Sequence, residues 1–226
     1  MSFKKNKYAV IKEAISNDLA IFLFNYFCMQ KQVYDTCRAT RYISPFENII
    51  GEYEPSDGQI PNTYAQYANI AMETLLLKCQ PKMEKVTGLK LYPAYTYARI
   101  YKKGDILERH KDRFSCEIST TMNLGGDPWP IYLNLDSKAG HVYGPKKGLH
   151  QVQHYKPTKD KGVKVDLKPG DMLVYSGCDL EHWRKKFKGT ACAQVFLHYN
   201  NCNTPGAKEN MFDKRRHLGL PTWFKK

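Results

Sequence analysis

The first part of the chain carries apolar residues at helical spacing. A short strand is predicted over residues 8–15. A helix is predicted over residues 17–38, where positions 19, 22, 23, 26 and 27 are apolar. Ser16 precedes this helix as a predicted N-cap, and Asp18 adds a favourable negative charge to its first turn.

A loop and a second helix are predicted next. Residues 45–62 are rich in Pro, Gly, Asp and Asn, which favour turns. A helix over residues 63–86 would place positions 68, 71, 72, 75, 76, 79 and 83 on one apolar face. Because Pro81 lacks a backbone N–H, it is predicted to bend this helix or to end it early.

Beyond Gly88 the pattern becomes that of strands separated by turns. The strand-like segments are β-branched, aromatic or alternating, and they cover 90–102, 117–124, 131–135, 163–167, 171–176 and 190–199. Helices followed by about eight short strands predict an α+β fold, a β-sandwich or barrel braced by the N-terminal helices. We expect a single domain over residues 1–226, with helical support over 1–88, a β core over 89–200 and a tail over 201–226.

Composition narrows the class of protein. The 226 residues are 42% hydrophobic and 25% charged, which argues against wholesale disorder. No apolar run approaches the roughly 18 to 20 residues of a membrane span, so no membrane partner is expected. The N-terminus lacks the apolar core of a signal peptide, and a cytoplasmic location is expected. Seven cysteines without a CxxC pair predict reduced thiols rather than disulfides or a cysteine zinc site.

The net charge of +13 leaves two interpretations open. The densest basic stretch is residues 145–168, with seven lysines against two acidic residues. One interpretation is a solvated, lysine-rich loop. The other is a surface that guides a negatively charged partner.

Three residues have the spacing of metal ligands. His110 and Asp112 follow a predicted strand, and side chains at positions i and i+2 of an extended segment project to the same side. His182 comes much later, directly after the strand pair around the Lys-Pro-Gly-Asp turn. Two histidines and one carboxylate on one face of an octahedral ion leave three positions open, an arrangement typical of non-heme Fe(II) oxygenases.

The segments around these residues form an ordered set of motifs. They are YARIYKKGDILERHKDRFSCEISTTMNL, then WPIYL, then LKPGDMLVYSGCDLEHWRKKFKGTACAQVFLHY. A strand tyrosine, a Gly-Asp turn, HxD, a Glu-x-Ser/Thr strand, a Lys-Pro-Gly-Asp turn and a distal histidine follow one another. This order resembles the prolyl 4-hydroxylase-like branch of the Fe(II)- and 2-oxoglutarate-dependent oxygenases. The resemblance covers residues 88–200 and implies a double-stranded β-helix, a distorted jelly roll.

The resemblance also implies an activity. It indicates a dioxygenase that uses Fe(II), 2-oxoglutarate and O2, with ascorbate as an additional reductant, and that releases succinate and CO2. His110, Asp112 and His182 are the implied metal ligands and catalytic residues. Family members that halogenate replace the carboxylate by a small residue, so Asp112 favours hydroxylation. The implied substrate is a prolyl or other residue in a peptide or protein.

In this family the distal carboxylate of 2-oxoglutarate binds a tyrosine hydroxyl and a cation inside the barrel. Tyr101 matches the family tyrosine, and Tyr97 is the nearby alternative. The family cation follows the distal histidine by nine or ten residues, where this chain has Ala191 and Cys192. Gln194 and His198 alternate with Cys192 along the last strand, either lining the pocket or serving as buried core groups.

Two other cations are candidates for the missing anchor. Arg184 and Lys188 both follow His182 closely. Arg184 is preferred because its planar fork matches a carboxylate with two hydrogen bonds.

Two further functions remain open. A small-molecule or nucleic-acid oxygenase on the same fold is compatible with the net charge, although no cluster of base-stacking aromatics is evident. A non-catalytic jelly-roll binding module would explain the missing cation but not the intact HxD and distal histidine. Loops over 45–62 and 136–162 are the candidate substrate loops.

Overall fold

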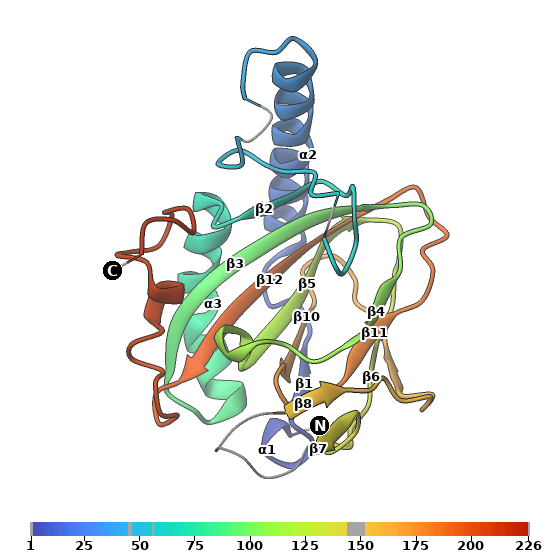
Figure 1. Cartoon of the computed structure of the whole chain (residues 1–226), viewed down its shortest axis with the longest axis vertical. Helices are drawn as coiled ribbons and strands as arrows, with labels where there is room; N and C mark the ends of the chain where they lie inside the picture. Colours follow the sequence, from blue (N-terminus) through green and yellow to red (C-terminus); the bar gives the residue numbers. More distant parts are fainter. Residues whose placement is uncertain (1, 45–46, 56, 144–151, 226) are drawn as a thin grey trace.

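The computed structural model describes residues 2–44, 47–55, 57–143 and 152–225 (Figure 1). Its strands are β1 Tyr8–Ile11, β2 Ala65–Tyr67, β3 Leu91–Lys102, β4 Leu107–His110, β5 Ile118–Gly126, β6 Ile131–Leu133, β7 His141–Tyr143, β8 Val152–Tyr155, β9 Val163–Val165, β10 Met172–Ser176, β11 His182–Arg184 and β12 Ala191–Asn201. Its helices are α1 Phe3–Asn6, α2 Asn17–Ala39 and α3 Ile70–Thr87, with short 3₁₀ helices η1 Phe114–Cys116 and η2 Met211–Lys214.

Two antiparallel sheets form the centre of the molecule. The larger sheet has the strand order β1-β10-β5-β12-β3-β2, and the smaller has the order β4-β11-β6-β9. Along the chain the strands β3, β5, β10 and β12 belong to the larger sheet, while β4, β6, β9 and β11 belong to the smaller one. This distribution is that of a double-stranded β-helix. The predicted α+β fold with a jelly-roll core is therefore confirmed.

Helices α2 and α3 brace the outer face of the larger sheet (Figure 1). The predicted start of α2 is correct, because the Ser16 side chain accepts a hydrogen bond from the backbone N–H of Leu19 at 3.3 Å. No helix among the described residues is long and apolar enough to cross a bilayer.

The predicted second helix was wrong at its start. Residues 65–67 form β2, which pairs with the edge of the larger sheet at β3. The helix begins only after Asn69, whose side chain accepts from the N–H of Met72 at 3.1 Å. Pro81 does not end the helix, which continues to Thr87. Pro81 lies on the exposed face, where water can satisfy the carbonyl that loses its donor.

The predicted loop over residues 136–162 contains a hairpin. β7 and β8 pair with each other in a separate two-stranded sheet. Residues 144–151, which carry part of the basic stretch, lie outside the described residues.

The larger sheet is buried on both faces, but its two faces differ in chemistry. On β12, the residues that face the helices are apolar, namely Ala193, Val195, Leu197 and Tyr199. The alternate residues point into the space between the sheets, namely Cys192, Gln194, Phe196 and His198, and they lie opposite Tyr101, Arg99, Tyr97 and Tyr95 of β3. The helix-facing side is thus a hydrophobic core, whereas the interior of the barrel is polar and aromatic.

Candidate metal centre

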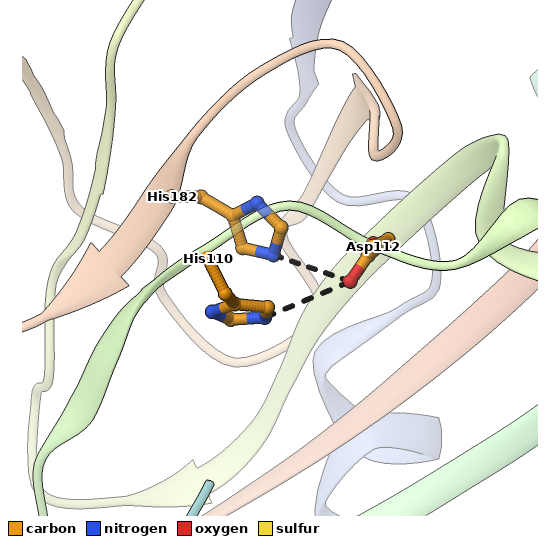
Figure 2. Close-up of side chains that lie close together, drawn as sticks. All are labelled: His110, Asp112 and His182. Atoms are coloured by element: carbon orange, nitrogen blue, oxygen red, sulfur yellow. Dashed lines mark ion pairs between the residues drawn. The ribbon is translucent and has the colours of Figure 1, made fainter. Parts of the chain in front are cut away.

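His110, Asp112 and His182 come together where β4 and β11 pair. His110 ends β4, His182 begins β11, and the two are opposite each other in the antiparallel register. Their Nε2 atoms lie 3.6 Å and 3.5 Å from Oδ1 of Asp112 (Figure 2). The three potential ligand atoms all lie within 4.8 Å of one another. Two imidazoles and one carboxylate therefore surround a common point.

The two histidines present the same nitrogen to that point. Nδ1 of His110 lies 2.8 Å from the carbonyl oxygen of Glu108, and Nδ1 of His182 lies 2.9 Å from that of Leu180. A carbonyl oxygen can only accept, so each Nδ1 carries a hydrogen, and in the neutral ring Nε2 then has the free lone pair. Metal-binding histidines are commonly oriented in this way.

Burial and mutual charge set the protonation of His110 and Asp112. Burial, together with the neighbouring His182, lowers the pKa of His110 to about 4. Burial acts to raise the pKa of Asp112, but the two histidines hold it well below its usual value. Near neutral pH, His110 is a neutral imidazole and Asp112 an anionic carboxylate, which are the forms that bind metal ions.

The three residues line a small cavity of about 90 Å³. Tyr97, Arg99 and Tyr101 of β3 form one wall, and Gln59 reaches the cavity from the predicted substrate loop over residues 45–62. The cavity therefore places residues of β3 and of that loop beside the candidate metal ligands.

Arg184 is a buried cation without a carboxylate partner. Its side chain is 1% exposed, and burial lowers its pKa. It donates to Thr121 Oγ1 at 3.0 Å and to the carbonyl oxygen of Trp129, while its Nε has no partner among the described residues. The other buried arginines in the described part of the chain, Arg99 and Arg215, are ion-paired with carboxylates. Arg184 thus has an unused donor and an uncompensated charge.

Of the two candidate tyrosines, Tyr101 has the hydroxyl that is still available. Tyr97 donates to Glu52 Oε1 at 2.9 Å and accepts from Arg99 at 3.1 Å. The Tyr101 hydroxyl makes no hydrogen bond to any described residue, although the side chain is only 2% exposed. Burial raises the pKa of Tyr101 to about 12, an effect that Arg99 and Arg184 partly offset, so its O–H remains a donor.

Neither Arg184 nor Lys188, the second candidate cation, is among the described residues that line the cavity. Arg184 is buried near Tyr101, which does line it, whereas Lys188 is exposed in the turn before β12, so its position gives no support to the predicted role. Cys192, which stands where a cation was expected, is buried opposite Tyr101. Burial raises the pKa of its thiol, and the Arg184 guanidinium opposes that shift. Arg184 thus brings positive charge to the neighbourhood of Cys192.

The sequence interpretation missed Thr121, which links Arg184 to the last strand. Thr121 Oγ1 donates to Gln194 Oε1 at 3.0 Å while it accepts from Arg184. A signal was present, because Ser119, Thr121 and Asn123 place a polar side chain at every second position of β5.

Comparisons with known proteins identify the fold. No protein-family profile matches the chain, and neither does any curated protein sequence. A prolyl-4-hydroxylase from Pseudomonas putida is similar in structure, with a TM-score of 0.54 and 13% identity over 88% of this chain and 95% of its own. SnoK, a non-heme α-ketoglutarate-dependent carbocyclase from nogalamycin biosynthesis, has a TM-score of 0.61 and 11% identity over 97% and 90%. HygX from Streptomyces hygroscopicus, solved with nickel and 2-oxoglutarate bound, has a TM-score of 0.54 and 12% identity over 89% and 85%.

Proposed function

We propose that this chain is an Fe(II)- and 2-oxoglutarate-dependent oxygenase that hydroxylates a C–H bond. The observation that carries the proposal is the combination of two features near one cavity. The first is the convergent group His110, Asp112 and His182. The second is Arg184, a buried guanidinium that lacks an anionic partner. The fold that the chain shares with 2-oxoglutarate-dependent oxygenases supports the same conclusion.

The donor set fits Fe(II). Two imidazoles and one carboxylate suit this ion, and they leave open positions for further ligands. His110 and His182 would each bind through Nε2, which their carbonyl-bonded Nδ1 atoms leave free. Asp112 would bind through Oδ1, the oxygen that faces both histidines. The protein contributes the orientation of these three ligands.

Two buried donors would fit the distal carboxylate of 2-oxoglutarate. Arg184 offers an unpartnered Nε–H, and Tyr101 offers a hydroxyl. Tyr101 lines the cavity and Arg184 lies close to Tyr101, and charge-assisted hydrogen bonds to a carboxylate are strong in a buried site. Arg184 would therefore replace the cation that the family places on the last strand, and Tyr101 would orient the same carboxylate.

When bound, the iron with 2-oxoglutarate and O2 supplies the oxidative decarboxylation to succinate and CO2 that is coupled to hydroxylation. The chain's own residues hold and orient these groups. The aromatic wall of Tyr95, Tyr97 and Phe196 lines the same cavity and limits the access of water.

For the substrate we propose a prolyl or other residue in a peptide or protein. The motifs that resemble the prolyl 4-hydroxylase-like enzymes support this choice, and so does the likeness in fold to the Pseudomonas putida enzyme. A small-molecule substrate is the second candidate, because SnoK, a carbocyclase of nogalamycin biosynthesis, is also similar in structure.

Anaerobic titration tests the proposed function. Adding 2-oxoglutarate to the Fe(II) protein is expected to produce a visible metal-to-ligand charge-transfer band, which His182→Ala should abolish. Succinate release and a product heavier by one oxygen atom are then measured with peptide, small-molecule and oligonucleotide panels. Stimulation by peptides alone supports the proposed substrate class. A Fe(II) protein that shows no band at saturating 2-oxoglutarate would contradict the proposed activity.

A further inference from the structure

The second carboxylate oxygen of Asp112 is held by a hydrogen-bonded chain. Oδ1 faces the two histidines, whereas Oδ2 accepts from Ser119 Oγ at 2.8 Å. Ser119 Oγ in turn lies 2.9 Å from Nδ1 of His198. These hydrogen bonds connect two paired strands, because Ser119 of β5 is opposite His198 of β12. Both residues are buried, at 0% and 5% exposure.

The chemistry of the three groups gives the chain a direction. A carboxylate only accepts, so the single hydrogen of the Ser119 hydroxyl is donated to Asp112. The carbonyl oxygen of Cys116 lies at the same distance of 2.8 Å from Ser119 Oγ, but it carries no charge and is the weaker acceptor. The remaining partner of Ser119 is then the N–H at Nδ1 of His198. The His198 ring is held in place by Tyr95, whose ring centroid lies 4.5 Å away.

Gly177 packs directly against the carboxylate of Asp112. A Cβ on Gly177 would lie 2.3 Å from Oδ2 of Asp112 and 2.8 Å from Oγ of Ser119, closer than atoms can approach. The Gly177 carbonyl oxygen accepts from the backbone N–H of Asp112 at 2.9 Å. Glycine is required here by lack of space.

We propose that Ser119 and His198 are positioning residues that hold Asp112 as a ligand through one oxygen. The hydrogen bond from Ser119 holds Oδ2 away from the two histidines, so Oδ1 faces the metal position, and binding through both oxygens would require the carboxylate to rotate away from Ser119. A second carboxylate oxygen on the metal would occupy a position that a cosubstrate needs. This inference rests on the proposed metal centre, and it assigns the polar residues of β5 and β12 to that centre.

Binding of Co²⁺ to the full chain tests the inference without a turnover assay. Ser119→Ala and His198→Phe remove the two links, and phenylalanine keeps the packing against Tyr95. Both variants are expected to bind Co²⁺ about 10- to 100-fold more weakly than the wild type. They should also shift the visible ligand-field bands of bound Co²⁺, because Asp112 is free to bind through both oxygens. Ser119→Thr retains the hydroxyl and should restore affinity and spectrum.

Thr120→Val is the matched control. Thr120 neighbours Ser119, is equally buried and points to the other face of the sheet, where it accepts from the N–H of Leu197 at 3.0 Å. It should retain the wild-type affinity for Co²⁺. Should Ser119→Ala fail to fold, His198→Phe remains as the test and should weaken binding.

Folded Ser119→Ala and His198→Phe proteins with wild-type Co²⁺ affinity and spectrum would overturn the inference while leaving the metal centre intact. Failure of the wild-type protein to bind Co²⁺, or binding that survives His182→Ala, would instead overturn the proposed centre and the inference with it.

Discussion

Replacement of Arg184 by methionine separates its role in binding from its effect on stability. Methionine has a similar length and no charge, so it fills the space with little change in packing. If Arg184 binds the distal carboxylate of 2-oxoglutarate, the variant should lose affinity for this cosubstrate. Because the guanidinium is buried without an anion, its removal should not destabilise the ligand-free protein.

The magnitudes follow from the contacts of Arg184. Truncating one partner of a buried, hydrogen-bonded charge pair costs about 2 to 5 kcal/mol, and a loss of about 3 kcal/mol weakens binding by roughly 150-fold. In the ligand-free protein the variant loses two hydrogen bonds, to Thr121 and to the Trp129 carbonyl, at about 1 kcal/mol each. It also removes an unpaired buried charge, whose burial costs several kcal/mol. Removing this cost should outweigh the loss of the two hydrogen bonds, so the free energy of unfolding of the ligand-free protein should increase. The melting temperature should then rise by about 4 °C.

Calorimetric titration of 2-oxoglutarate into the Co²⁺-loaded protein measures the affinity, and thermal unfolding without ligand measures the stability. Arg99→Met is the control, because Arg99 is a buried arginine that lines the cavity but is already paired with Asp57. It should retain affinity for 2-oxoglutarate. Wild-type affinity in Arg184→Met, or a loss confined to Arg99→Met, would refute the assignment of the anchor.

Three other predictions concern the metal ligands and the C-terminal tail. Co²⁺ at about 100 times its dissociation constant should stabilise the wild type by about 2.7 kcal/mol in thermal unfolding, and Asp112→Ala should abolish this gain. Arg215→Met should lower the free energy of unfolding by about 3 to 5 kcal/mol in urea, because it leaves the carboxylate of Glu73 buried and unpaired; a loss below 1 kcal/mol would contradict this. Burial acts to raise the pKa of Asp213, but its ion pair with Arg113 holds that pKa well below its usual value. Asp213→Asn should therefore cost about 1 kcal/mol at pH 7 and equally at pH 5, and the difference should shrink below about pH 4, where Asp213 of the unfolded chain takes up a proton; a constant difference down to pH 3 would argue against the ion pair.

Sequence patterns correctly predicted a helix whose cap and apolar spacing lie within its own segment. The helix predicted over residues 17–38 is observed over Asn17–Ala39, because its cap and its apolar spacing both lie within the segment. The second helix was predicted to begin seven residues too early. The residues before Asn69 pair instead with β3, a partner about thirty residues away in the chain, and helical spacing alone contains no information about that pairing.

In the candidate site, too, the sequence predicted what lies within one segment and not what depends on the pairing of distant strands. His110 and Asp112 could be selected from the sequence because two ligands share one extended segment. The hydrogen-bonded series from Asp112 through Ser119 to His198 could not be predicted from the sequence. It depends on β5 and β12 being neighbours in one particular register. The alternating polar residues of these strands indicated only that they face inward.

The sequence alone predicted the strand-like segments and the ligand pair His110 and Asp112, because period-two alternation and the HxD spacing act over a few residues. His182, about 70 residues later, followed only from the order of motifs that resembles the oxygenase family. Only the tertiary structure distinguished the environments of Arg184 and Lys188, which lie four residues apart. Arg184 is enclosed because Thr121 and Trp129 approach it from segments 63 and 55 residues away, whereas Lys188 lies in an exposed turn. Burial of a guanidinium depends on how two sheets close over it, and that is a property of long-range packing.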